Sequence, residues 1–252
     1  MPVVDNPDDR DALRALRAAQ EDPWVMYLVA RREKLPTAGE LLQAAAEATL
    51  DVSLRFTRDP KWTSHFAEWG SRSFRKVCLR ASERDWKKLE VFDRGEGLAR
   101  GEPVVRALPP RLKSEREKLL VELQALTGEV SALGLDAREM GDAPTLRFAL
   151  NADAPMGAGK LAAQVGHAVL IAARVLGPRH AAAFEAWMSA GRPAGFARGD
   201  RDAWASLRAT EEVAVVRDAG LTEVAPGTET VMALAPSAPS GWGELWRALP
   251  RV

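Results

Sequence analysis

The sequence feature that most constrains the fold of this 252-residue chain is a series of blocks that occurs twice in the same order. The segment AGELLQAAAEATL, residues 38–50, aligns without a gap with AGKLAAQVGHAVL, residues 158–170, and five positions are identical. Two later blocks repeat at spacings of 118 and 126 residues. The matched residues are Phe66, Trp69, Ser71, Arg80, Trp86 and Leu89 with Phe184, Trp187, Ser189, Arg198, Trp204 and Leu207, then Gly101, Val105, Ala107, Leu108 and Pro110 with Gly227, Val231, Ala233, Leu234 and Pro236. This order predicts an internal duplication, although alanine and leucine are common enough for two segments of similar composition to align by accident.

Both copies also have the same order of strand-like and helix-like segments. In the first copy a helical pattern begins at residue 38, and apolar or alternating runs indicate strands at 23–30, 73–81 and 102–110. In the second copy a helical pattern begins at residue 158, and similar runs indicate strands at 145–152, 193–199, 212–220 and 229–236. We therefore expect an α/β fold of two similar αβα three-layer halves. Each half should have a small mixed sheet of about four strands flanked by helices.

The expected boundaries are an N-terminal arm or helix at 1–21, a first half at 22–127, a linker at 128–143 and a second half at 144–252. The linker GEVSALGLDAREMGDA is rich in glycine and charge, as connecting segments are. Just before it, Ser114 and Glu117 have the spacing of a capping box and predict a helix that continues through Leu126.

Charge and cysteine content exclude several classes of protein. The 35 Lys and Arg residues balance the 35 Asp and Glu residues, so a basic surface must be a local patch. Cys78 is the single cysteine, which excludes an internal disulfide and a multi-cysteine metal site. No apolar run reaches membrane-spanning length, and the first residues lack a signal-peptide pattern. We expect a cytoplasmic protein with no membrane contact, no metal and no cofactor.

The segment MGAGKLAAQVGHA, residues 156–168, places Lys160, Gln164 and His167 at i, i+4 and i+7, along one stripe of a helix. It is not a Walker A loop, because position 161 is leucine where serine or threonine is needed. The glycine-rich start of the helix offers backbone N–H groups and a positive dipole end to an anion. In the alternative interpretation, the small residues only allow close helix packing and His167 is a core histidine.

A second stretch, DAGLT at residues 218–222, follows a predicted strand and turns the chain. It supplies one carboxylate, from Asp218, and one hydroxyl, from Thr222, on a short loop. In the alternative interpretation, Asp218 only caps the turn.

Taken together, the two stretches resemble the type 2 peptidyl-tRNA hydrolase family, and the resemblance covers about residues 144–236. It rests on Asp153, on MGAGK at 156–160, on AAQ at 162–164 with His167, on DAG at 218–220 with Thr222, and on APG at 225–227. Members of that family hydrolyse the ester between a peptide and the ribose of tRNA. The resemblance implies peptidyl-tRNA as partner and Lys160, Asp218 and Thr222 as catalytic residues. The substrate-binding residues that it implies are Gly157, Gly159, Gln164, His167 and Gly220.

Two positions depart from the family pattern and keep alternatives open. Leu221 and Glu223 stand where many relatives have arginine and glutamine, and both changes weaken attraction to phosphates. The alternatives are an inactive RNA-binding or interaction module of the same fold, and an esterase or amidase for a smaller anionic ester. In the first copy Glu40, Ala44 and Glu47 replace Lys160, Gln164 and His167, so we interpret that copy as a scaffold. We expect the two copies to form a pseudo-dimer that is monomeric in solution.

Overall fold

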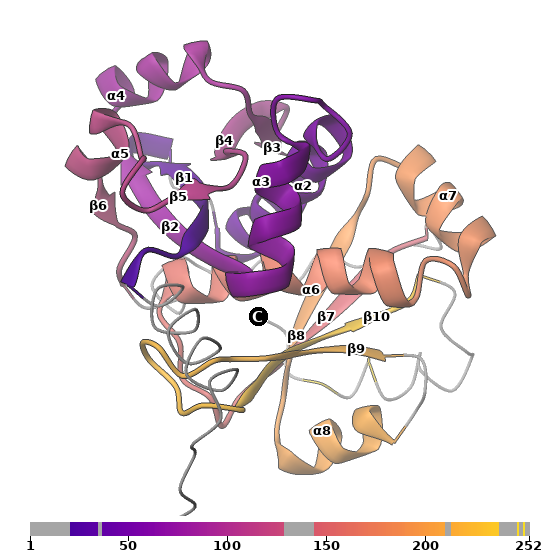
Figure 1. Ribbon diagram of the computed structural model, residues 1–252. Coiled ribbons are helices and arrows are strands. Elements are labelled where there is room, and N and C mark those ends of the chain that lie inside the picture. Colours follow the sequence, from indigo (N-terminus) through magenta and orange to yellow (C-terminus); the bar gives the residue numbers. More distant parts are fainter. Residues whose placement is uncertain are drawn as a thin grey trace, which may run out of the picture.

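The computed structural model describes residues 21–34, 37–128, 144–209 and 213–236, together with Trp246 and Leu249. Two open mixed sheets, one in each half of the chain, are flanked by helices (Figure 1). The expectation of an α/β fold with two similar αβα halves is confirmed. The expected N-terminal arm and linker lie almost wholly outside the described residues, and the domain boundaries stay predictions. Within the described ranges, every helix is too short or too polar to cross a membrane.

The sheet of the first half has six strands in the order β3-β4-β1-β2-β6, with β5 paired to β1. Strands β1 and β2 are parallel, and the other pairs are antiparallel. The strands are β1 (Trp24–Arg31), β2 (Arg75–Ala81), β3 (Gly95–Ala99), β4 (Glu102–Ala107), β5 (Arg111–Leu112) and β6 (Gln124–Ala125). The helices are η1 (Arg32–Lys34), α2 (Ala38–Phe56), α3 (Thr63–Glu68), η2 (Trp69–Ser73), α4 (Glu83–Lys88), η3 (Leu89–Val91) and α5 (Lys118–Glu122).

The sheet of the second half has four strands in the order β8-β7-β10-β9. Its strands are β7 (Leu146–Asn151), β8 (Ala194–Gly199), β9 (Val213–Arg217) and β10 (Glu229–Leu234), and its helices are α6 (Ala158–Val175), α7 (Ala181–Ser189) and α8 (Arg201–Arg208). Strands β7 and β8 are parallel, and β10 is antiparallel to both β7 and β9. The order β9-β10-β7-β8 therefore matches β3-β4-β1-β2 strand for strand, including the direction of each pair.

Local contacts repeat along with the topology. The indole Nε1 of Trp69 donates to the carbonyl oxygen of Arg75 at 2.7 Å, and that of Trp187 donates to Pro193 at 2.9 Å. Each donor and each acceptor lies 118 residues from its counterpart. The same spacing relates the edge-to-face pairs Phe66–Trp69 and Phe184–Trp187, the positive-φ residues Phe74 and Arg192, and the helix N-caps Ser82 and Asp200. The matched tryptophans thus mark the same structural position in both halves.

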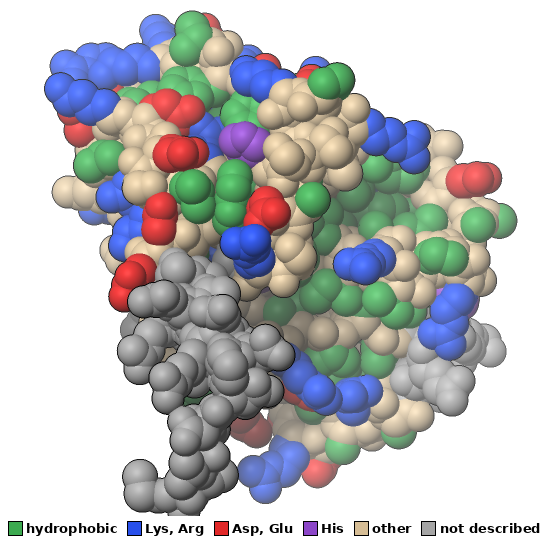
Figure 2. All heavy atoms as spheres, in the orientation of Figure 1, with side chains coloured by type: hydrophobic (Ala, Val, Ile, Leu, Met, Phe, Trp, Pro, Cys, Tyr) green, Lys and Arg blue, Asp and Glu red, His purple; other side chains and the backbone are tan. Residues whose placement is uncertain are grey.

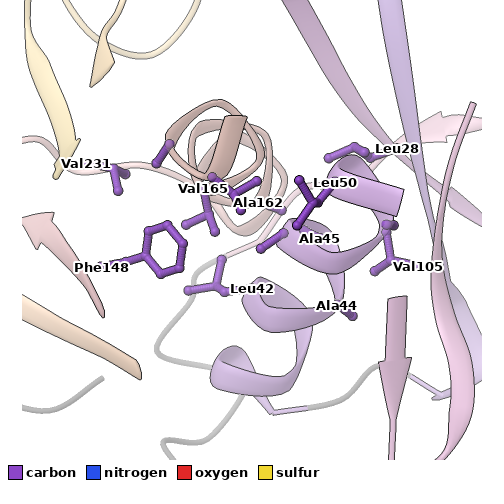
Figure 3. Packing of buried hydrophobic residues seen from close by; sticks show 14 of the residues in the cluster. Leu28, Leu42, Ala44, Ala45, Leu50, Val105, Phe148, Ala162, Val165 and Val231 are labelled. Carbon is purple, nitrogen blue, oxygen red and sulfur yellow. The ribbon is translucent and has the colours of Figure 1, made fainter. Parts of the chain in front are cut away.

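The two halves meet along α2 and α6, which pack side by side. On the face drawn in Figure 2, hydrophobic side chains gather in the hollow between the halves. One core cluster continues from the first sheet through both helices to the second sheet, as the close view of Ala45, Ala162, Val165 and Phe148 shows (Figure 3). Gly166 permits the close approach, because a Cβ there would lie 2.8 Å from Thr49 Oγ1. The first half therefore buries a face of α6 that the sheet of the second half does not cover.

Two local features differ from the expectations. The prediction of a capping box at Ser114 is wrong. The hydroxyl and the amide of Ser114 donate to the carboxylate of Asp22, at 2.6 and 2.8 Å. Helix α5 begins only at Lys118, after the N-cap Glu117, whose carboxylate pairs with Arg111 instead of capping the helix, and it ends at Glu122. The first sheet is also larger than the expected four strands. The additional strands β5 and β6 have two residues each, too few to produce a periodic pattern.

Strand β3 was not predicted, and its glycines explain why. Its sequence GEGLA has no apolar alternation, since Gly95 and Gly97 face the helix α2. A Cβ at Gly97 would overlap the carbonyl oxygen of Ala44, and one at Gly95 would overlap that of Ala48. Glycine is thus needed for this strand to pack directly on the helix backbone.

Candidate functional site

The candidate site forms where the first turn of α6 meets the end of β9. Small residues around Gly159 let the start of α6 pack closely, and Lys160 and Gln164 point toward β9 from successive turns of α6. Asp218 directly follows β9, where its amide donates to Thr228 and its carbonyl accepts from Gly227, at 2.9 and 2.7 Å. These backbone bonds fix where the Asp218 carboxylate lies.

The carboxylate of Asp218 is the centre of a polar network. Its Oδ2 pairs with Lys160 Nζ and accepts from Gln164 Nε2 at 2.7 Å, and its Oδ1 accepts from the Gly220 amide at 2.8 Å. Gln164 Oε1 in turn accepts from the hydroxyl of Thr230 at 2.7 Å. We call Lys160, Gln164, Asp218 and Thr230 the Asp218 network. Asp218 Oδ2 thus binds both Lys160 and Gln164, which holds the ammonium of Lys160 in one position.

The Asp218 network is mostly buried but keeps access to solvent. The side chains of Lys160 and Asp218 are 13% and 7% exposed. Charges in such a place are screened less than surface charges, and the Asp218 carboxylate compensates the Lys160 ammonium, so an incoming anion must share this ammonium with Asp218. The turn that follows requires glycine at position 220, where φ is 74° and a Cβ would overlap Pro226.

The N-terminus of α6 is closed by groups of the chain itself. The amide of Gly157 donates to Glu223 Oε2 at 2.6 Å, and the amide of Ala158 donates to the carbonyl of Gly128 at 2.9 Å. A Cβ at Gly159 would overlap the carbonyl oxygen of Leu126, so this glycine permits close contact with the end of the first half. Glu223 therefore occupies the position that the sequence suggests for an anionic ligand.

The structure does not bring all the expected residues together. Thr222 lies in the exposed loop after Gly220, and within the described residues no hydrogen bond joins its side chain to the Asp218 network. His167 lies at the contact between the halves, where its Nδ1 is 2.9 Å from Lys76 Nζ of β2. Burial lowers the pKa of His167 well below its usual value, and the nearby charges of Lys76 and Lys160 lower it further.

Thr230 is a member of the network that the sequence did not reveal. Strict alternation along β10 would place its side chain on the face of Met232, away from α6. The register between β9 and β10 shifts between Glu229 and Val231, and this irregularity lets the Thr230 hydroxyl reach Gln164. A threonine beside a turn in an otherwise apolar strand was the only available signal.

The first half has the reverse arrangement of charge at the equivalent place. Glu40, at the position of Lys160, pairs at 3.2 Å with Arg100, the first residue after β3 as Asp218 is the first after β9. Glu40 also accepts from the Thr37 amide at 3.1 Å in a capping box that starts α2. Ala44 replaces Gln164. This place carries a carboxylate where the second half carries a cation, and it cannot bind an anionic substrate in the same way.

The comparisons with known proteins concern the second half alone. Residues 145–249 match the family described as Peptidyl-tRNA hydrolase PTH2. The C-terminal part of the chain matches the PTH2 family. This confirms the resemblance seen in the sequence, and the PTH2 match contains the whole Asp218 network, Glu223 and His167.

One relative of the PTH2 part is the human protein named "Peptidyl-tRNA hydrolase 2, mitochondrial". It is 30% identical over 109 residues, which are 40% of this chain and 61% of the relative. The chain thus spans about three fifths of that relative's length. The relative's name places that protein in mitochondria, and a cytoplasmic location for this chain stays a prediction. Within the described residues, no group of three or more His, Cys, Asp or Glu side chains gathers as a possible metal site.

Proposed function

We propose that the PTH2-like half hydrolyses the ester bond of peptidyl-tRNA and releases free tRNA and peptide. In this reaction the oxygen of water attacks the ester carbonyl, and the ribose oxygen leaves with a proton. The observation that carries the proposal is the position of Lys160, held by Asp218 beside Gln164 within the PTH2 match. An ammonium fixed in a poorly screened place stabilises a developing oxyanion or binds a phosphate.

The residues of the site divide the work in this proposal. Lys160 meets the oxyanion, and Gln164 supplies an amide beside it. The oxygens of Asp218 already accept from three donors, so a water must share this carboxylate with Lys160 and Gln164. Thr222, on its exposed loop, holds the water or a ribose hydroxyl. Of the expected substrate-binding residues, Gln164 and His167 contact the substrate through their side chains in this proposal. The amides of Gly157 and Gly220 already donate to Glu223 and Asp218, and Gly159 packs on Leu126, so these glycines shape the site.

The proposal is tested by incubating the purified full-length chain with N-acetylaminoacyl-tRNA at several salt concentrations. We expect release of deacylated tRNA, with KM rising steeply between about 50 and 200 mM salt because tRNA binding displaces counterions. Salt-sensitive binding of tRNA without hydrolysis would instead support the RNA-binding module. Turnover of small anionic esters with little salt dependence would support the smaller-substrate esterase.

We further propose that the first half is a duplicated copy that serves as a scaffold and makes the chain a monomeric pseudo-dimer. The equal strand order, the repeated tryptophan contacts and the α2–α6 contact support this proposal. Light scattering during size exclusion is expected to give a mass near 27.4 kDa. A stable homodimer joined through the second half would contradict it.

The contact between Glu223 and α6 gives a separate prediction about tRNA affinity. Glu223→Gln removes a negative charge at the helix N-terminus, and we expect KM for peptidyl-tRNA to fall about three- to tenfold. The measurement is initial rate against substrate concentration at low salt. Glu185→Gln is the matched control, because it removes the same charge from an exposed position on α7. Equal effects of the two substitutions would show that only net charge matters.

A further inference from the structure

The contact between Lys76 and His167 joins the two halves beside the proposed site. Lys76 extends from β2 of the first half, is 9% exposed, and places Nζ 2.9 Å from His167 Nδ1. The ring of Phe74 also packs on the imidazole, with centroids 4.7 Å apart. The imidazole of His167 is therefore held by side chains of the first half, two helical turns beyond Lys160.

The surroundings of Lys76 determine the direction of this hydrogen bond. Burial lowers the pKa of Lys76 well below its usual value, but its Nζ lies 4.6 Å from the ring centroid of Trp69 and 4.4 Å from that of Phe74, and these two ring faces stabilise the ammonium against that loss of solvation. An ammonium has three N–H donors and no acceptor, so Nδ1 must accept. The proton of the neutral imidazole then lies on Nε2.

We propose that Lys76 is a positioning residue of the catalytic site, which holds His167 neutral, with its proton on Nε2. This inference rests on the proposed function, because it gives the first half a part in the reaction beyond support. The charged groups acting on His167 are Lys76 from β2 and Lys160 from its own helix, and both oppose its protonation. With Nδ1 occupied, Nε2–H is the part of His167 that is left to donate to substrate.

The contact is not a repeated feature of the two halves. The counterpart of His167 is Glu47, 120 residues earlier, and the counterpart of Lys76 is Ala194, 118 residues later. The lysine–histidine pair therefore occurs where the first half meets α6. The equivalent positions, Glu47 of α2 and Ala194 of the second half, do not form such a pair. A purely structural contact between the halves needs neither a buried lysine nor a histidine, because apolar residues fill such places at lower cost.

The test is ¹⁵N NMR of the imidazoles in the full chain, which has three histidines, combined with peptidyl-tRNA kinetics. In the wild type, His167 should show a protonated Nε2 and a bare Nδ1. In Lys76→Met the His167 titration midpoint should rise toward its ordinary value, the single tautomer should be lost, and kcat should fall about tenfold or more with KM little changed. Lys76→Arg retains a charged donor and should restore the tautomer and most of the kcat.

Thr49→Val is the matched control. Thr49 is fully buried at the same contact, and its hydroxyl has no hydrogen-bond partner among the described residues, so the isosteric change should alter neither the titration nor kcat. An imidazole protonated on Nδ1 in the wild type would overturn the proposal, whether or not Lys76→Met folds. A normal kcat in Lys76→Met with an altered titration would also overturn it. If the wild type does not hydrolyse peptidyl-tRNA, the proposed function fails, and the catalytic part of this proposal fails with it; the NMR result still decides the tautomer.

Discussion

Replacing Lys160 by alanine is expected to lower kcat/KM for peptidyl-tRNA by about 100- to 1000-fold, the usual loss when one stabiliser of an oxyanion is removed. The ammonium of Lys160 is paired with Asp218 and only 13% exposed, so it is held in one place before substrate binds. The measurement is the initial rate of hydrolysis at substrate concentrations well below KM, where the rate is proportional to kcat/KM. Thermal unfolding of the same sample shows whether the fold is kept.

Arg100→Ala is the control for this prediction. It removes the first half's equivalent ion pair with Glu40 from a side chain that is 79% exposed, and it should leave turnover unchanged. Near-normal activity in Lys160→Ala would remove this lysine from the reaction. An equal loss in both variants would show that ion pairs in general, rather than the PTH2-like site, determine activity.

The second large effect concerns folding. Gly97→Ala is expected to lower the free energy of unfolding by about 3 kcal/mol or more, as overpacking against a backbone that cannot move does. The added Cβ would overlap the carbonyl group of Ala44 on α2, and strand β3 would have to separate from this helix. Urea denaturation followed by circular dichroism measures the change.

Gly39→Ala is the matched control, because it makes the same substitution in the first turn of α2. In the part of the chain that the structure describes, a Cβ at Gly39 would have no heavy atom of a neighbouring element within 4 Å. Alanine is also the better helix former, so stability should be unchanged or rise by up to about 1 kcal/mol. If Gly97→Ala were as stable as the Gly39 variant, the close packing of β3 on α2 would be wrong.

Much of the fold was predictable because the repeated pattern is strong. The helical segment expected to begin at residue 38 forms α2, which begins at Ala38, and the apolar run at 23–30 forms most of β1. Strand β3 was missed because its glycines are required by close packing against the backbone of α2 and do not form a hydrophobic face. The helix expected after Ser114 was shorter because Asp22, 92 residues away, takes the capping hydroxyl.

The sequence predicted that Lys160, Gln164 and Asp218 belong to one site, and the structure places them in hydrogen-bond contact. Thr230 was missed because a register shift, which no alternation pattern shows, turns its hydroxyl toward α6. The roles assigned to Thr222 and His167 stay predictions, since Thr222 is on an exposed loop and His167 contacts Lys76.

The sequence by itself determined the two similar halves and the stripe of Lys160 and Gln164, because both depend on periodicity and on local spacing along one chain. Only the tertiary structure decided that Glu223 closes the N-terminus of α6 and that Lys76 holds His167. These contacts join residues 66 and 91 positions apart, and they depend on how a loop folds back and on how β2 of the first half packs against α6. Residue spacing along the chain does not predict these long-range contacts, because they form only when whole elements pack together.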